Sequence, residues 1–161
     1  MSRHLIRCAI TSLVMRATPL VSQEPHVSTQ APPDKPVSVT SDEQKRRLDA
    51  AVAPYVAQAR ATYPKAKQRY LAGLPPQHSF FVTVELRDAA GHSEMAFLAV
   101  DSLARDSIFG RIWNQINVVR GFHLRDRHAV SEAELLDWLI SKPDGSEEGN
   151  VVGKFLDTYR P

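Results

Sequence analysis

The segment from Ser79 to Arg87 limits the fold most, because its apolar residues recur with a period of two. In an extended chain such a pattern places alternate side chains on opposite faces. One face then carries only apolar side chains, those of Phe80, Val82, Val84 and Leu86. The other face carries a mixed set, namely Phe81, Thr83, Glu85 and Arg87. Residues 88–92 place Gly91 where a hairpin loop needs a positive φ. Residues 94–101 are apolar on both sides, which predicts a returning central strand covered on both faces.

Two further strands are predicted after this hairpin. Residues 108–119 have the composition of a third strand, with a bulge or bend at Gly110 or near Asn114. A fourth strand ends at Val130, and the charged residues at 123–128 are typical of an exposed sheet edge.

The segment before the hairpin has a helical pattern. Thr40 or Ser41 can cap the first turn, and the apolar residues that follow recur at helical spacing: Leu48, Ala51, Val52, Tyr55, Val56 and Ala59. Pro54 lies within this stripe, so we expect a kink or two abutting helices. Pro64 predicts a second break and a new helix over 65–72.

The last thirty residues begin with a capping box, in which the Ser131 side chain and the Glu134 side chain cap each other's backbone. This predicts a short helix or tight turn through Leu139, with Leu135, Trp138 and Leu139 facing inward, followed by a Gly-rich segment. The fold class predicted is therefore α+β: an N-terminal helical segment on an antiparallel sheet of about four strands.

The first forty residues differ in composition from the rest. Residues 1–16 form a degenerate signal-like leader with a short apolar run, and residues 17–40 form a disordered or extended tether rich in Pro, Ser and Thr. Residues 41–161 form a single domain. We favour export to the periplasm over a cytoplasmic location, and no run is long enough for a transmembrane segment.

Several functions are disfavoured by composition. The net charge is only +2 and the basic residues are scattered, so we predict no nucleic-acid partner. The single cysteine, Cys8, excludes a disulfide framework within the chain and a multi-cysteine zinc site. The six histidines lack the spacing of metal ligands, and no nucleophile elbow or phosphate loop occurs. We therefore predict neither a metal nor a cofactor.

Paired carboxylates are the remaining enzymatic possibility. Asp137 could form an acid/base pair with Glu147 or Glu148, as in glycoside hydrolysis, if the loop folds back. The structural alternative is that Asp137 caps backbone N–H groups while the two glutamates are solvated. Asn114 and Asn150 are expected to tie loops or bulges, and an exposed Trp113 would mark a partner surface.

Part of the chain resembles a known family. The segments Glu94–Val100 and Ile108–Asn114, then Gly121 and Leu135–Trp138 with a Gly-rich finish, resemble the bacterial family catalogued as domain of unknown function 2314. The resemblance covers roughly residues 54–161, and Phe122 departs from it where an acid commonly follows the glycine. It implies the fold and the domain extent, and it implies no activity.

Two hypotheses for function remain. The first is a non-enzymatic interaction or binding module, of a regulatory or immunity type, that contacts a protein partner or small ligand. Its binding face would include Trp113, Asn114, Asp137, Trp138, Glu147, Glu148 and Asn150. The second is a small envelope-polymer hydrolase that uses Asp137 and Glu148 as its two carboxylates.

Overall fold

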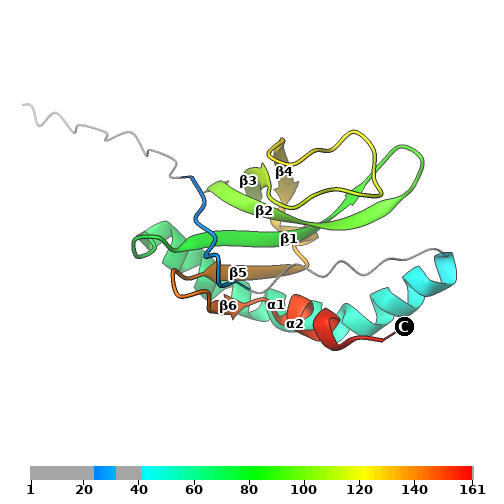
Figure 1. The fold of residues 1–161 in the computed structure, drawn as a ribbon, viewed down its shortest axis with the longest axis horizontal. Coiled ribbons are helices and arrows are strands. Elements are labelled where there is room, and N and C mark those ends of the chain that lie inside the picture. Colours follow the sequence, from blue (N-terminus) through cyan, green and yellow to red (C-terminus); the bar gives the residue numbers. More distant parts are fainter. Residues whose placement is uncertain (1–23, 32–40, 161) are drawn as a thin grey trace, which may run out of the picture.

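The computed structural model describes residues 24–31 and 41–160 and has the α+β class that the sequence predicts. Six strands form one antiparallel sheet in the order β4-β3-β2-β1-β5-β6, with two helices beside it (Figure 1). The elements are α1 (Asp42–Ala72), β1 (Ser79–Arg87), β2 (Ser93–Ala104), β3 (Ser107–Ile112), β4 (Arg127–Ser131), a 3-10 turn (Glu132–Glu134), β5 (Asp137–Ser141), β6 (Glu147–Gly149) and α2 (Val151–Thr158).

The main core lies between α1 and one face of the sheet. The predicted apolar face of β1 is buried there, and Trp138 and Ile140 of β5 share it because they pair with Val82 and Phe80. From α1, Ala59, Tyr63 and Ala66 pack onto this face. We call it the helix face, and it accounts for most of the buried apolar side chains.

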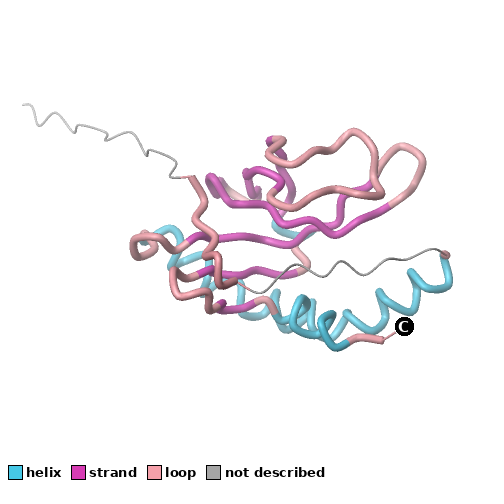
Figure 2. Tube along the Cα trace, viewed as in Figure 1, coloured by secondary structure: helices cyan, strands magenta, loops and turns pink. Residues whose placement is uncertain are grey.

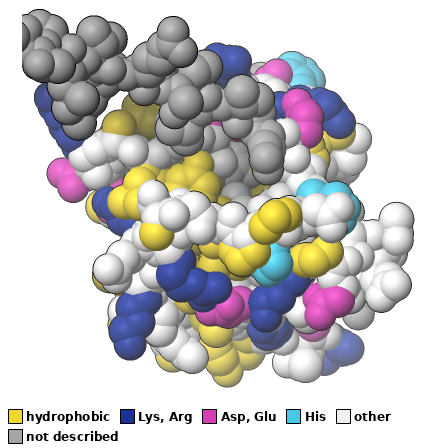
Figure 3. All heavy atoms as spheres, turned by 90° about the vertical axis from the view of Figure 1, so that its left-hand side faces the viewer, with side chains coloured by type: hydrophobic (Ala, Val, Ile, Leu, Met, Phe, Trp, Pro, Cys, Tyr) yellow, Lys and Arg dark blue, Asp and Glu magenta, His cyan; other side chains and the backbone are white. Residues whose placement is uncertain are grey.

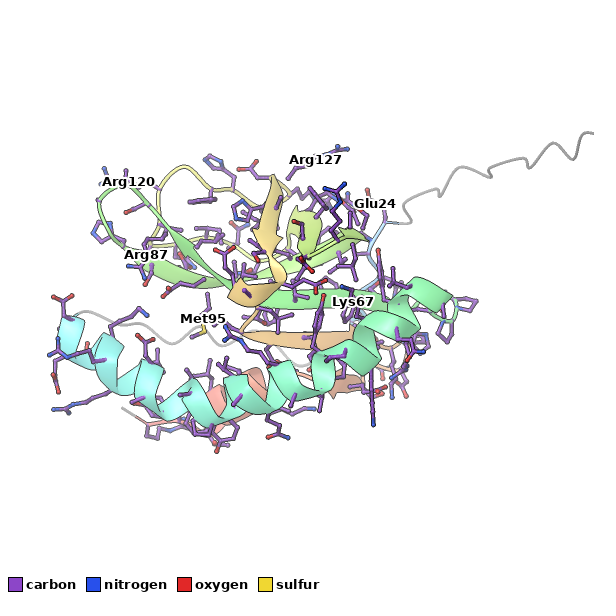
Figure 4. The ribbon with its side chains drawn as sticks, turned by 180° about the vertical axis from the view of Figure 1, so that it is seen from behind. Glu24, Lys67, Arg87, Met95, Arg120 and Arg127 are labelled. Carbon is purple, nitrogen blue, oxygen red and sulfur yellow. The ribbon has the colours of Figure 1, made fainter. Side chains whose placement is uncertain are left out.

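The helix α1 is one continuous element, so the predicted break at Pro64 is wrong. Ser41 caps it as predicted, by accepting a hydrogen bond from the Gln44 backbone N–H. Both prolines lie inside the helix, which bends along its length (Figure 4). Buried residues flank each proline, and their packing offsets the backbone hydrogen bond that each proline removes.

The sheet has two more strands than predicted, because strand β5 begins inside the predicted helix or turn and strand β6 lies in the predicted Gly-rich segment. The 3-10 turn with its capping box ends after Glu134, and the Leu136 backbone N–H then donates to the Thr83 carbonyl. All five residues of β5 are buried, so no alternation could reveal the strand. The predicted third strand also ends early, at Ile112, and the irregularity in register falls on β2, between Val100 and Ser102.

Residues 24–31, which we call the arm, have no helix or strand and lie against the sheet (Figure 2). Glu24 forms an ion pair with Arg111, and the His26 backbone N–H donates to the Ser79 hydroxyl. Residues 1–23 and 32–40 lie outside the described residues, so the leader, the rest of the tether and export remain predictions. Neither described helix has the length and apolar character needed to cross a membrane.

Candidate functional site

The face of the sheet opposite α1, which we call the open face, carries a second apolar cluster. Phe81, Ala99 and Leu139 are buried in it, and Phe97 and Trp113 are half-buried against them. Above this cluster lies a cavity of about 670 Å³. Pockets of roughly 300–1,000 Å³ with mostly apolar walls are the usual sites for small molecules in proteins.

The walls of the cavity come from several separate segments. Leu48 near the start of α1 and Val152 of α2 form one wall, and both belong to a third apolar cluster. Met95 of β2 joins this cluster from the sheet, and Figure 4 shows it reaching toward α1. Val27 and Ala31 of the arm line the cavity from another side. The cavity therefore depends on segments that are far apart in the chain.

One end of the cavity is polar. Ser141 of β5 pairs with Glu147 of β6, so their side chains point to the same face. The Asn150 side-chain amide donates to the Glu147 carboxylate over 2.7 Å. Ser141 is only 3% exposed, and neither its hydroxyl nor the Asn150 amide oxygen has a hydrogen-bond partner among the described residues.

The charged lining of the cavity is predominantly acidic. Its five acidic residues are Asp49, Glu85, Glu94, Glu147 and Asp157, and its two basic residues are Lys45 and Lys154. This bias is local, because on the described part of the side drawn in Figure 3 acidic side chains lie next to basic ones.

Most of these charges already have partners. Lys45 contacts both Asp49 and Glu85, at 2.7 Å each. Glu94 accepts hydrogen bonds from the backbone N–H groups of residues 117–119. The Lys154 ammonium donates to the Gly149 carbonyl at 2.7 Å.

Four of the seven predicted binding residues line this cavity: Trp113, Asn114, Glu147 and Asn150. Trp113 packs against Phe81, with ring centroids 6.3 Å apart, and the Arg125 guanidinium lies 5.3 Å from its ring centroid. Asn114 ties a loop as predicted, because its amide oxygen accepts from the Phe97 backbone N–H. These four residues therefore share one lining, and their role in binding stays a prediction.

The other three predicted residues do not line the cavity. Trp138 lies on the helix face, where its Nε1–H donates to the Ala59 carbonyl and to the Thr62 hydroxyl. Asp137 is 1% exposed and accepts from the backbone N–H groups of Trp138 and Val152. Burial raises the pKa of Asp137 to about 6.

The position of Glu148 separates it from Asp137. Glu148 pairs with Ile140 on the helix face and forms an ion pair with Arg69 of α1. Asp137 is three residues before Ile140 on the same strand, so it points to the opposite face. Asp137 and Glu148 are separated by the sheet and do not form the predicted acid/base pair.

The residues that sequence reasoning missed are those of the cavity floor and its polar end. Leu139 and Ser141 could not be placed on the open face because β5 was not predicted as a strand. The sequence pattern placed Phe81 on the correct face of β1. Its aromatic side chain on a face predicted to be mixed was the signal that could have indicated an apolar cluster there. No three His, Cys, Asp or Glu side chains in residues 24–31 and 41–160 come together as a possible metal site.

Comparisons with known proteins add no relatives to these observations. The chain matches no model of a known protein family, no curated protein and no solved structure. The resemblance drawn from the sequence motifs therefore stays a prediction.

Proposed function

We propose that this chain is a non-enzymatic binding module that holds a small, largely apolar molecule in the cavity on the open face. The observation that carries the proposal is an apolar cluster above which the described residues leave about 670 Å³ of space. A sheet normally buries its apolar face against another element. Here α2 and the arm border the cavity without filling it.

The lining supports a small molecule over a folded protein partner. Three aromatic side chains, Phe81, Phe97 and Trp113, line the cavity, and the polar residues Ser141, Glu147 and Asn150 lie at one end of it. Ligand pockets combine an apolar lining with a few placed polar groups that orient the ligand. A protein interface, in contrast, is usually a broad patch with an apolar centre and a polar rim.

The biological role within this proposal stays open to test. A regulatory or immunity-type role, and membership of the family catalogued as domain of unknown function 2314, remain parts of the proposal that rest on size and sequence motifs. The hydrolase alternative loses support, because Glu148 lies on the opposite face of the sheet from Asp137, and Asp137 itself is only 1% exposed. We therefore propose binding alone.

The test uses a neutral apolar fluorophore, N-phenyl-1-naphthylamine, titrated with the full chain. We expect saturable binding in the micromolar range with a rise in fluorescence. Thr83→Phe should weaken binding by about tenfold, because Thr83 lines the cavity on the open face beside Phe97. Met95→Trp fills the cavity from another wall and should also weaken binding of the fluorophore.

The matched control is Thr158→Phe, which adds the same side chain at an exposed position on α2 outside the cavity lining. It should bind the fluorophore like the unaltered chain. Far-ultraviolet circular dichroism of each variant separates loss of binding from loss of folding. Equal binding by all folded variants, or no saturable binding by the unaltered chain, would contradict the proposal.

A further inference from the structure

We infer that the ligand of the cavity is an amphipathic cation, with an apolar body and a primary ammonium group that pairs with the Glu147 carboxylate. This inference rests on the proposed function, because it names the class of molecule that the same cavity binds.

Three polar side chains lie at one end of the cavity lining. Ser141 and Glu147 are direct cross-strand partners on the open face, and Asn150 is bonded to Glu147. Among the described residues the Ser141 hydroxyl and the Asn150 amide oxygen have no partner. Both atoms have almost no accessible surface, and the Asn150 oxygen lies against Gly153 of α2, so the half-buried Glu147 carboxylate is the acceptor at this end that a ligand can reach.

The charge at this end also lacks a counterion. Among the described residues the Glu147 carboxylate accepts a hydrogen bond only from the neutral Asn150 amide, and no Lys, Arg or His of this part of the chain lies within ion-pair distance of it. Its neighbour Glu148 has Arg69 as a partner on the other face. A half-buried carboxylate at the end of an apolar cavity is stabilised by a cation that enters with the ligand.

The other charges of the lining do not supply that cation. The Lys45 ammonium is held between Asp49 and Glu85, and the Lys154 ammonium is turned to the Gly149 carbonyl. Lys154 does lie in the same lining, so it reduces the attraction for a cation without removing the acidic excess.

An ammonium group suits a carboxylate that lacks a counterion. It carries three N–H donors and no acceptor, whereas a hydroxyl offers one donor and a carboxylate none. A carboxylate ligand would also be repelled by Glu147. The apolar body would lie over Leu139, Phe81 and Trp113, which extend from β5 across the open face.

The experiment compares three probes that share one aromatic body: 2-(1-naphthyl)ethylamine, 2-(1-naphthyl)ethanol and 1-naphthylacetate. Isothermal titration calorimetry at neutral pH gives the affinity of each for the full chain. We expect the amine to bind about tenfold more tightly than the alcohol, and the carboxylate most weakly. Glu147→Gln keeps the shape and removes the charge, so it should abolish the preference for the amine.

Glu148→Gln is the matched control, because it makes the same change one residue away on the opposite face. It should keep the preference for the amine. Equal affinity for amine and alcohol, or a preference that survives Glu147→Gln, would overturn the inference while leaving cavity binding intact. Failure of all three probes and of N-phenyl-1-naphthylamine would instead refute the proposed function itself.

Discussion

Replacing Asp137 with alanine is expected to lower the free energy of unfolding by about 3 kcal/mol at neutral pH. The Asp137 carboxylate accepts from the Val152 N–H at 2.6 Å and from the Trp138 N–H at 2.8 Å, and both contacts are buried. Alanine would leave these donors without partners and would detach the start of α2 from β5. Urea denaturation, followed by circular dichroism, measures the loss.

The same residue gives the stability a dependence on pH. Burial raises the pKa of Asp137 to about 6 in the folded state, above the ordinary value of 3.8. A raised pKa means that the folded state binds the proton more tightly than the unfolded state does. The resulting stabilisation is complete below about pH 4 and is lost as the pH rises through about 6. It amounts to at most about 3 kcal/mol.

The stability difference between the unaltered chain and Asp137→Ala should therefore widen as the pH falls from 7 to 5. Asp137→Asn is the informative companion, because it keeps one acceptor and cannot titrate. Its free energy of unfolding at neutral pH should fall by less than that of the alanine variant. Its own stability should lack the dependence on pH that Asp137 gives the unaltered chain. A difference that narrows toward pH 5 would show that the hydrogen bonds to the charged carboxylate outweigh its burial.

Trp138→Ala is expected to cost still more, about 4 kcal/mol, because it removes a large buried side chain from the helix face. The ring lies 6.5 Å from the Phe80 ring, centroid to centroid, and its Nε1–H donates to the Ala59 carbonyl of α1. Trp138→Phe keeps most of the packing, so it isolates the hydrogen bonds of the indole and should cost about 1–2 kcal/mol.

Trp113→Ala is the matched comparison for Trp138→Ala. Trp113 is half-buried on the open face, beside the cavity, so its loss should cost about 1 kcal/mol. Thermal or urea unfolding of the three variants should therefore rank Trp138→Ala as by far the least stable. Similar stability of the two alanine variants would contradict the assignment of the main core to the helix face.

The parts of the fold that the sequence predicts are those with an uninterrupted local signal. The alternation in β1, the loop with Gly91 at φ +88° and the Ser41 cap each depend on a few neighbouring residues, and all three are present. Strand β5 could not be predicted in this way. It is buried on both faces, and the capping box before it is a real helical signal that stops after three residues.

The site was harder to predict than the fold because it depends on register. The sequence drew attention to both Glu147 and Glu148, and only the pairing of β6 with β5 shows which one enters the cavity. Asn150 was expected to tie a loop, and its bond to Glu147 does so, yet its second polar atom remains without a partner among the described residues. Local pattern cannot supply such long-range pairings.

The adjacent acids of β6 have a consequence for how this site could change during evolution. The turn of residues 142–146 sets the register that places Glu147 opposite Ser141. Deleting one turn residue would shift β6 by one position and place Glu148 there, so a carboxylate would still face the cavity. Inserting one residue would bring Ser146 to that position and remove the charge. The doubled glutamate thus protects the charge of the site against loss of one residue in the turn but not against gain of one.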